Sequence, residues 1–448
     1  MKNEIKDRKP QFAEEGIRHA TINNHRIHLR VMDPGRNVNY LAIDGRTLLV
    51  IDRTAAAFWR HIIDGMWKFQ RGEGDASKDV KDYVLSQMAK QYRRIPPKRI
   101  LADLDRNFGT VIGVAGSGCP VEAGLGVKKI DVNKWAAPMR MDLAVTYECN
   151  LKCDKCYIAQ DIKEGVTPLP REDWIRVFRT LWKIGVYTVT FTGGEPLLRT
   201  DIVDLVSEAE EFVTGLVTNG TLLEQYAVDL KNASLDYCQV TLESFKRETH
   251  EAMTLTPGSF GKTVAGIEKA LSLGMQVITN TTLTRTNAAD FIGLIGFNKR
   301  LGITQMACNT LICSGQGIQC RQETGLSAGE LKEILSEACR KAKEAGVVLQ
   351  WYSPTCYNEL NPLEFGFGVK ECSACSYNMT VQPDGTVLPC QSWHTPVGNI
   401  LKDPWKKIWN NPVCRKLRRH AFAPAKCRGC GFMSTCGGGC PLEGEGAK

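Results

Sequence analysis

The pattern of apolar and polar positions divides the chain into four stretches. Over residues 17–52, short apolar runs separated by Asp-Pro-Gly and Asp-Gly-Arg turns predict three short strands. Three helical patterns follow, and the first begins at Thr54 and ends at Gly65. Because strands followed by helices are typical of a separate α+β layer, we expect a small module over residues 1–115.

From residue 140 onward, strands alternate with helices, of which the clearest lie over 170–185 and 260–274. Repeated β–α units predict a parallel sheet with its chemistry at the carboxyl ends of the strands. About six units are too few to close a (β/α)8 barrel, so we expect a partial (β/α)6 barrel of the TIM type over residues 139–350. The expected strands are 141–147, 188–194, 215–220, 237–244, 276–284 and 303–312.

The other two stretches lack clear periodicity. Residues 116–138 are rich in glycine and are predicted to form a linker. Residues 351–448 are rich in Cys, Gly and Pro, so we expect metal clusters to organise them as a small C-terminal domain. The predicted class is therefore α/β, a partial barrel with an N-terminal α+β winged-helix-like module and a Cys-rich C-terminal iron–sulfur domain.

The composition is that of an ordinary globular protein, with 43% hydrophobic and 24% charged residues. No apolar run approaches the ~20 residues that span a bilayer, and the charged N-terminus contains no signal-peptide core. The net charge of +8 is spread over scattered basic residues rather than a basic stripe. We therefore expect a cytoplasmic protein with no nucleic-acid partner and no membrane association.

The 18 cysteines are the unusual feature of the composition. A cytoplasmic chain with a large core has little need of disulfides, and clusters with short gaps favour metal or iron–sulfur sites. Cys149, Cys153 and Cys156 follow an expected strand with the spacing C-x3-C-x2-C. Three thiolates can hold a 4Fe–4S cluster and leave one iron open to a small molecule, as catalytic zinc sites keep an open position. A zinc site with a remote fourth ligand is the alternative.

This spacing, followed by the aromatic Tyr157, resembles that of the radical S-adenosylmethionine (SAM) enzymes. The resemblance implies that a reduced cluster on the three cysteines cleaves SAM, and that a 5'-deoxyadenosyl radical then abstracts a substrate hydrogen. Further SAM-binding residues follow from motifs that match the family, GGEP for the methionine amino group and TNG near the nucleoside. These residues are Gly193, Gly194, Glu195, Pro196, Thr218 and Asn219.

Two later strand ends carry weaker matches. Glu243 lies where relatives have an acid that contacts the ribose, so the resemblance implies the same role here. Asn280 and Arg285 are candidates for the SAM carboxylate region. The alternative for these two residues is a strand-end amide and a surface arginine.

The C-terminal cysteines resemble the SPASM extension of radical SAM enzymes, which carries two auxiliary 4Fe–4S clusters. The resemblance implies that the first auxiliary cluster is held by Cys372, Cys375, Cys390 and Cys440, and the second by Cys427, Cys430 and Cys436. The family pattern continues with one more cysteine that this sequence lacks. The candidates for the fourth ligand of the second cluster are Cys356, Cys414, Glu443 and Glu445. A zinc ribbon is the alternative for this second set, since four thiolates also suit zinc.

Residues 17–110 resemble the small PqqD-like peptide-recognition domain, most closely over YLAIDGRTLLVIDRTAAAFWRHIIDG. Such domains pair an extended leader peptide onto a sheet edge. With three 4Fe–4S clusters, SAM and an external donor of the flavodoxin or ferredoxin type, the resemblance implies a maturase that crosslinks a ribosomally made precursor peptide. Alternatives are a sulfatase-maturase-like enzyme that makes formylglycine, a porphyrin-modifying enzyme, and a zinc-carrying peptide-binding scaffold.

Overall fold

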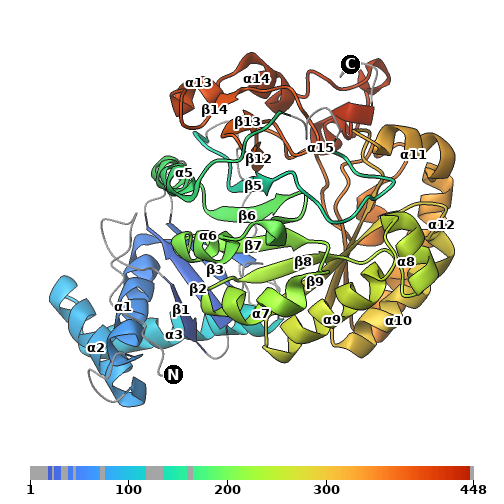
Figure 1. The fold of residues 1–448 in the computed structure, drawn as a ribbon. Coiled ribbons are helices and arrows are strands. Elements are labelled where there is room, and N and C mark those ends of the chain that lie inside the picture. Colours follow the sequence, from blue (N-terminus) through green and yellow to red (C-terminus); the bar gives the residue numbers. More distant parts are fainter. Residues whose placement is uncertain are drawn as a thin grey trace. The chain divides into compact units, whose positions relative to one another are not determined.

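The computed structural model describes residues 19–22, 25–31, 39–43, 47–70, 76–117, 135–158 and 165–443. Most of the expected linker and the candidate ligand Glu445 lie outside these residues. The chain divides into two compact units, whose elements are labelled in Figure 1. Unit 1 comprises Met1–Ala137, Phe178–Thr188 and Glu208–Val213; unit 2 comprises Pro138–Val177, Val189–Ser207 and Thr214–Lys448.

Unit 1 contains an antiparallel sheet in the order β1-β2-β3-β4, followed by three helices. The elements are β1 (His19–Ile22), β2 (His25–Arg30), β3 (Asn39–Ile43), β4 (Thr47–Ile51), α1 (Arg53–Gln70), α2 (Ala76–Gln91) and α3 (Pro97–Ser117). The predicted order of strands then helices is confirmed, with a fourth strand in place of the expected three.

Both predicted ends of the first helix were wrong. The Asp52 carboxylate accepts a hydrogen bond from the Ala55 N–H at 2.7 Å, so Asp52 rather than Thr54 caps α1. The helix also continues past Gly65 to Gln70. A Cβ at Gly65 would lie 3.1 Å from the Tyr83 ring, so this glycine allows α1 and α2 to pack closely instead of ending the helix.

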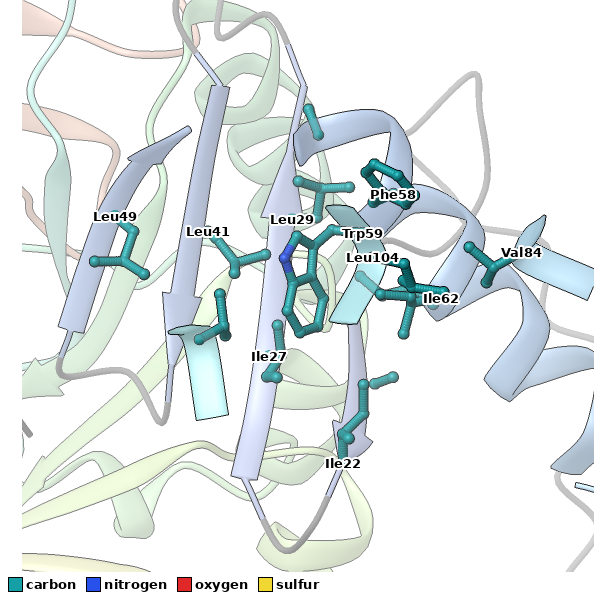
Figure 2. Close-up of a cluster of buried hydrophobic side chains, with 14 of the residues drawn as sticks. Ile22, Ile27, Leu29, Leu41, Leu49, Phe58, Trp59, Ile62, Val84 and Leu104 are labelled. Atoms are coloured by element: carbon teal, nitrogen blue, oxygen red, sulfur yellow. The ribbon is translucent and has the colours of Figure 1, made fainter. Parts of the chain in front are cut away.

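The core of unit 1 lies between the sheet and the helices (Figure 2). Trp59 of α1 is fully buried among the side chains of Ile27, Leu29 and Leu41. Its ring stacks on Phe108 of α3 with centroids 6.0 Å apart. All three helices contribute buried side chains to this cluster, which gives the module a hydrophobic core of its own.

Unit 2 is organised around an open sheet, ten-stranded in the described part of the chain, in the order β11-β10-β9-β8-β7-β6-β5-β12-β13-β14 (Figure 1). The pairings of β7 with β8, β8 with β9, β9 with β10, β10 with β11 and β5 with β12 are parallel. The strands are β5 (Arg140–Thr146), β6 (Thr188–Gly193), β7 (Val213–Thr218), β8 (Tyr237–Thr241), β9 (Gln276–Leu283), β10 (Gln305–Thr310), β11 (Val348–Trp351), β12 (Asn378–Val381), β13 (Thr386–Leu388) and β14 (Gly398–Asn399).

The helices that accompany this sheet are α5 (Arg171–Ile184), α6 (Ile202–Glu208), α7 (Leu223–Asn232), α8 (Arg247–Thr254), α9 (Ser259–Ser272), α10 (Phe291–Leu301), α11 (Gly317–Thr324), α12 (Ala328–Ala345), α13 (Trp405–Trp409), α14 (Pro412–Arg418) and α15 (Met433–Cys436). Short 3-10 turns are η2 (Pro196–Leu198), η3 (Ala288–Asp290), η4 (Pro362–Phe365), η5 (Ala425–Cys427) and η6 (Pro441–Glu443). The predicted partial barrel is confirmed, and all six expected strands are present. Among the described residues, no helix has the length and apolar character needed to cross a membrane.

The C-terminal segment continues the barrel sheet. β12 pairs in parallel with β5, and Asn378 lies opposite Arg140. β13 and β14 then extend the sheet by antiparallel pairing. The segment therefore shares the sheet of unit 2, whereas its composition had suggested a domain organised by metal clusters alone.

Candidate active site

A cavity of about 1210 Å3 lies within unit 2. Side chains of β8 line it at alternate positions, namely Tyr237, Gln239 and Thr241, because successive residues of a strand point to opposite faces. Two groups of cysteines also line this cavity. They are Cys149, Cys153 and Cys156 from the loop after β5, and Cys372, Cys390 and Cys440 from the C-terminal segment.

The three-cysteine loop is anchored to the end of α8 by its main chain. The Lys152 N–H donates to the Thr254 carbonyl at 3.2 Å, and the Asp154 N–H donates to the Met253 carbonyl at 3.3 Å. These bonds hold the loop backbone against the end of α8. The thiols can therefore be presented to the cavity by a loop whose shape is set before any ligand binds.

A buried ion pair also holds this loop. The Lys155 ammonium lies 3.2 Å from one carboxylate oxygen of Glu243, and the two side chains are 7% and 1% exposed. The other oxygen of Glu243 accepts from the Thr282 N–H at 2.9 Å. Glu243 lines the cavity as the ribose prediction requires, but both of its oxygens already have protein partners. The carboxylate therefore anchors the loop in this structure, and its contact with the ribose stays a prediction.

The donor set of the loop fits an iron–sulfur cluster. Burial raises the pKa of the Cys153 thiol to about 12; the Lys155 ammonium opposes this shift, and Glu243 and the thiols of Cys149 and Cys156 add to it. The thiols are thus close enough to influence one another, and iron would have to displace their protons on binding. In the described part of the chain, no three or more His, Cys, Asp or Glu side chains are placed to hold a single metal ion.

Glu195 forms a buried hydrogen-bond network at the ends of β6 and β7. It is fully buried and does not line the cavity. One carboxylate oxygen accepts from the Thr218 hydroxyl at 2.7 Å and the Leu197 N–H at 3.1 Å, and the other from the Asn219 N–H at 2.8 Å. Burial raises the pKa of Glu195 to about 7, although these hydrogen bonds oppose the shift. In this structure the carboxylate ties the end of β6 to the end of β7, and its contact with a ligand ammonium stays a prediction.

The backbone of the same motif does reach the cavity. Gly193 and Gly194 line the cavity, and the backbone at the end of β5 leaves no room for a side chain at either position. A Cβ would lie 2.0 Å from the Thr146 carbonyl oxygen at Gly193, and 2.1 Å from the Glu148 carbonyl oxygen at Gly194. The Gly194 N–H donates to the Thr146 carbonyl at 2.8 Å. Pro196, the last residue of the motif, is buried and begins η2. The glycines therefore allow the ends of β5 and β6 to meet.

The remaining predicted SAM residues separate into two groups. Thr218, Asn219 and Asn280 line the cavity, and the buried side-chain oxygen of Asn280 has no hydrogen-bond partner among the described residues. Arg285 does not join them. It follows the end of β9 and pairs with Glu330 at 3.2 Å, where the two side chains are 50% and 41% exposed. The alternative interpretation of Arg285 as a surface residue is the one that the structure supports.

Tyr157 links the two groups of cysteines. Its hydroxyl donates to the Gln391 side-chain oxygen at 2.7 Å, and Gln391 directly follows Cys390. Among the C-terminal thiols that line the cavity, burial raises the pKa of Cys390 to about 12, and the Cys372 thiol raises it further. Cys375 lies behind them, buried, with its sulfur 2.7 Å from that of Cys414.

The second C-terminal set lies apart from the cavity. Burial raises the pKa of the Cys427 thiol, and its neighbours raise it further, in the order Cys356, Cys436 and Cys430. Of the candidates for a fourth ligand, Cys414 contacts Cys375, and Glu443 forms an ion pair with Arg321 at 3.2 Å. Cys356 is thus the candidate that lies among the thiols of the second set.

Several cavity residues gave no signal in the sequence. Lys155 occupies a variable position of the cysteine motif and His250 belongs to no motif; burial lowers the pKa of His250 to about 4, so the imidazole is neutral at pH 7. Arg140 and Asp142 also line the cavity and form an ion pair at 3.1 Å, and Asn378 donates to the same carboxylate at 2.8 Å. In the sequence, only the cavity-facing positions of the expected strand over 141–147 could have suggested that the cavity has a polar lining.

Comparison with known proteins agrees with this site. The model of the radical SAM superfamily matches residues 143–297, and the SPASM model, an iron–sulfur cluster-binding domain, matches residues 372–431. The chain therefore contains a radical SAM domain and a SPASM domain, and it is an enzyme that binds SAM and iron–sulfur clusters.

The similar proteins include peptide-modifying enzymes. The chain is 24% identical over 317 residues to the PqqA peptide cyclase of Granulibacter bethesdensis, covering 68% of this chain and 83% of that protein. It is 25% identical over 316 residues to an AdoMet-dependent heme synthase of Oleidesulfovibrio alaskensis, covering 66% and 80%. Streptococcus suis SuiB bound to the precursor peptide SuiA has the same fold, with a TM-score of 0.62 and 16% identity over 93% of this chain and 94% of that one.

Proposed function

We propose that this enzyme is a maturase of a ribosomally made precursor peptide. One observation carries the proposal, namely that the thiols of the loop after β5 and those of Cys372, Cys390 and Cys440 line the same cavity. A radical generated at one wall of this cavity would have an electron acceptor at another wall. The peptide cyclase among its relatives supports a peptide substrate, as does the resemblance of its fold to a protein that binds a precursor peptide.

The proposed cofactors are SAM and three 4Fe–4S clusters. Cys149, Cys153 and Cys156 would hold the cluster that binds SAM, and the C-terminal cysteines would hold two auxiliary clusters. When bound, the reduced cluster and SAM supply a 5'-deoxyadenosyl radical, which takes one hydrogen atom from the peptide. Formation of a C–C, C–S or C–O crosslink then releases a proton and one electron, which an auxiliary cluster accepts. A flavodoxin- or ferredoxin-type donor would reduce the first cluster, and the reducing cytoplasm would keep the thiols free.

In this proposal the residues of the cavity have separate tasks. The glycines of the motif Gly193-Gly194 and the unpartnered oxygen of Asn280 bind SAM, together with Thr218 and Asn219. Glu195 positions those strand ends, and the pair of Lys155 and Glu243 positions the cluster loop. Arg285 has no part in it.

Residues 17–110 would bind the leader of the precursor. The strand order leaves β1 and β4 at the two edges of the sheet of unit 1. The Trp67 indole N–H donates to the His19 carbonyl at 2.6 Å, so β1 already has a side-chain partner. The Val50 side chain on β4 is 54% exposed. We therefore assign β4 as the edge to which an extended peptide adds.

Anaerobic reconstitution with a peptide encoded beside this gene tests the proposal. We expect about 12 irons per chain, three clusters of four, formation of 5'-deoxyadenosine, and a peptide that has lost two hydrogens. Cys153→Ala should abolish SAM cleavage. Bound zinc without 5'-deoxyadenosine would rule out the enzyme, and SAM cleavage with every neighbouring peptide unchanged would rule out the substrate class.

A further inference from the structure

The segment between β11 and η4 contacts the loop that carries Cys427, Cys430 and Cys436. The Asn358 side-chain N–H donates to the Cys430 sulfur at 3.2 Å. The Tyr357 ring lies 6.0 Å from the Phe432 ring, and Glu359 forms an ion pair with Lys426. Three consecutive residues of the segment therefore each reach a different part of the loop.

Cys356 directly precedes these three residues, and its backbone meets that of Gly439. A Cβ at Gly439 would lie 2.9 Å from the Cys356 backbone nitrogen, and Gly439 has a φ of 83°. Glycine at this position, between Cys436 and Cys440, lets the two backbones meet without a clash. The Cys356 side chain lies next to the Cys427 thiol, which has Cys430 and Cys436 as its other neighbours.

We propose that Cys356 is the fourth thiolate ligand of the second auxiliary cluster, together with Cys427, Cys430 and Cys436. The inference rests on the proposed function, in which Cys427, Cys430 and Cys436 hold an auxiliary cluster. Its new element is that the fourth ligand comes from a segment 71 residues before Cys427 in the chain. The rival candidates have other partners, since Cys414 lies against Cys375 and Glu443 is paired with Arg321.

Four thiolates change what this cluster can do. A cluster with a full set of protein ligands has no open iron, so it can transfer electrons but cannot bind the substrate. The loop after β5 has the opposite property, because its three thiols leave one position for SAM. The proposal therefore assigns the second auxiliary cluster to electron transfer.

Iron analysis and electron paramagnetic resonance (EPR) test the assignment without relying on activity. A variant with Cys149, Cys153 and Cys156 replaced by Ala should retain only the two auxiliary clusters, about eight irons. In this background we compare Cys356→Ser with Cys427→Ser and with Cys339→Ser, a half-buried thiol on α12 that serves as the matched control. The signal of the first auxiliary cluster reports that unit 2 is folded in each variant.

We expect Cys356→Ser to lose between one and four irons, as Cys427→Ser does, and Cys339→Ser to lose none. Cys356→Asp should retain iron with an altered EPR spectrum, because a carboxylate can replace the thiolate. Unchanged iron and EPR in Cys356→Ser, with iron lost in Cys427→Ser, would overturn the inference and leave the proposed function standing. Unchanged iron in both variants, or zinc in place of iron, would overturn the second auxiliary cluster itself.

Discussion

The buried pair of Lys155 and Glu243 offers a direct test of how the cluster loop is held. Lys155 lies between the second and third cysteines of the loop, and its ammonium also donates to the Met253 carbonyl at 3.4 Å. Lys155→Met keeps much of the side-chain volume but removes the charge. Glu243→Gln removes the opposite charge and keeps an oxygen that can accept from the Thr282 N–H.

The magnitude follows from the geometry. At the 3.2 Å separation, an effective dielectric constant of about 20 gives a Coulomb attraction of about 5 kcal/mol. Desolvation of the two groups offsets much of this attraction, but the loss of one partner leaves the other charge buried and costs about 3–5 kcal/mol. Each single variant should therefore weaken the loop strongly. The double variant should be close to wild type, because it leaves no buried charge.

Hydrogen exchange of the apoprotein measures this effect where it occurs. The amides of Lys152 and Asp154 donate to the end of α8, so their exchange reports on opening of the loop. A loss of about 3 kcal/mol corresponds to exchange more than about 100-fold faster. Lys152→Met is the matched control, since Lys152 is an exposed lysine on the same loop.

Two results would refute this reasoning. Equal exchange in Lys155→Met and wild type would mean that the backbone bonds to α8 alone hold the loop. Additive effects of the two single variants in the double variant would mean that the charges do not interact. In reconstituted protein, the same order of variants should appear in the rate at which the loop cluster loses its iron.

Three other positions give predictions. Burial raises the pKa of Glu195 to about 7, so its protonated form stabilises the fold fully below its ordinary pKa of about 4.5, and this stabilisation, up to about 3 kcal/mol, is lost as the pH rises through 7. The free energy of unfolding in urea should show this decline with pH in wild type and not in Glu195→Gln. Parallel pH profiles of the two proteins would contradict the prediction. Gly194→Ala should weaken SAM binding in equilibrium dialysis by more than about tenfold, or about 1.4 kcal/mol, because the new Cβ would clash with the Glu148 carbonyl. The control Gly109→Ala should bind SAM normally, because no atom lies within 4 Å of a Cβ at that position. Val50→Asp should weaken binding of a fluorescent leader peptide by about tenfold. The control Val228→Asp changes a similarly exposed valine on α7 and should leave this affinity unchanged. Equal affinities of Val50→Asp and wild type would exclude β4 as the docking edge.

The sequence predicted those parts of the site whose residues are neighbours in the chain. The spacing of Cys149, Cys153 and Cys156 is a property of one loop, and the six expected strands carry strong local patterns. β11 was missed because it has only four residues, of which Val348 is 54% exposed. A strand that short gives no clear alternation of apolar and polar positions.

The errors at the site come from partners that are distant in the sequence. The motif around Glu195 predicted the close approach of the glycine backbone but gave no hint of the hydrogen bonds of the carboxylate, because its donors Thr218 and Asn219 lie at the end of the next strand. The ion pair of Lys155 with Glu243 joins residues from two different strand ends, and no local spacing encodes it.

The contacts of Tyr157 explain why the C-terminal segment belongs to the same unit as the barrel. Its hydroxyl donates to Gln391 at 2.7 Å, and its carbonyl accepts from the Ser314 hydroxyl at 3.0 Å. The His394 ring nitrogen lies 3.1 Å from the same carbonyl. The residue directly after the third loop cysteine is thus held on both its side chain and its backbone, partly by residues that follow Cys390. The position of the loop therefore depends on the C-terminal segment, so the barrel without that segment would lack part of the support for its own cluster.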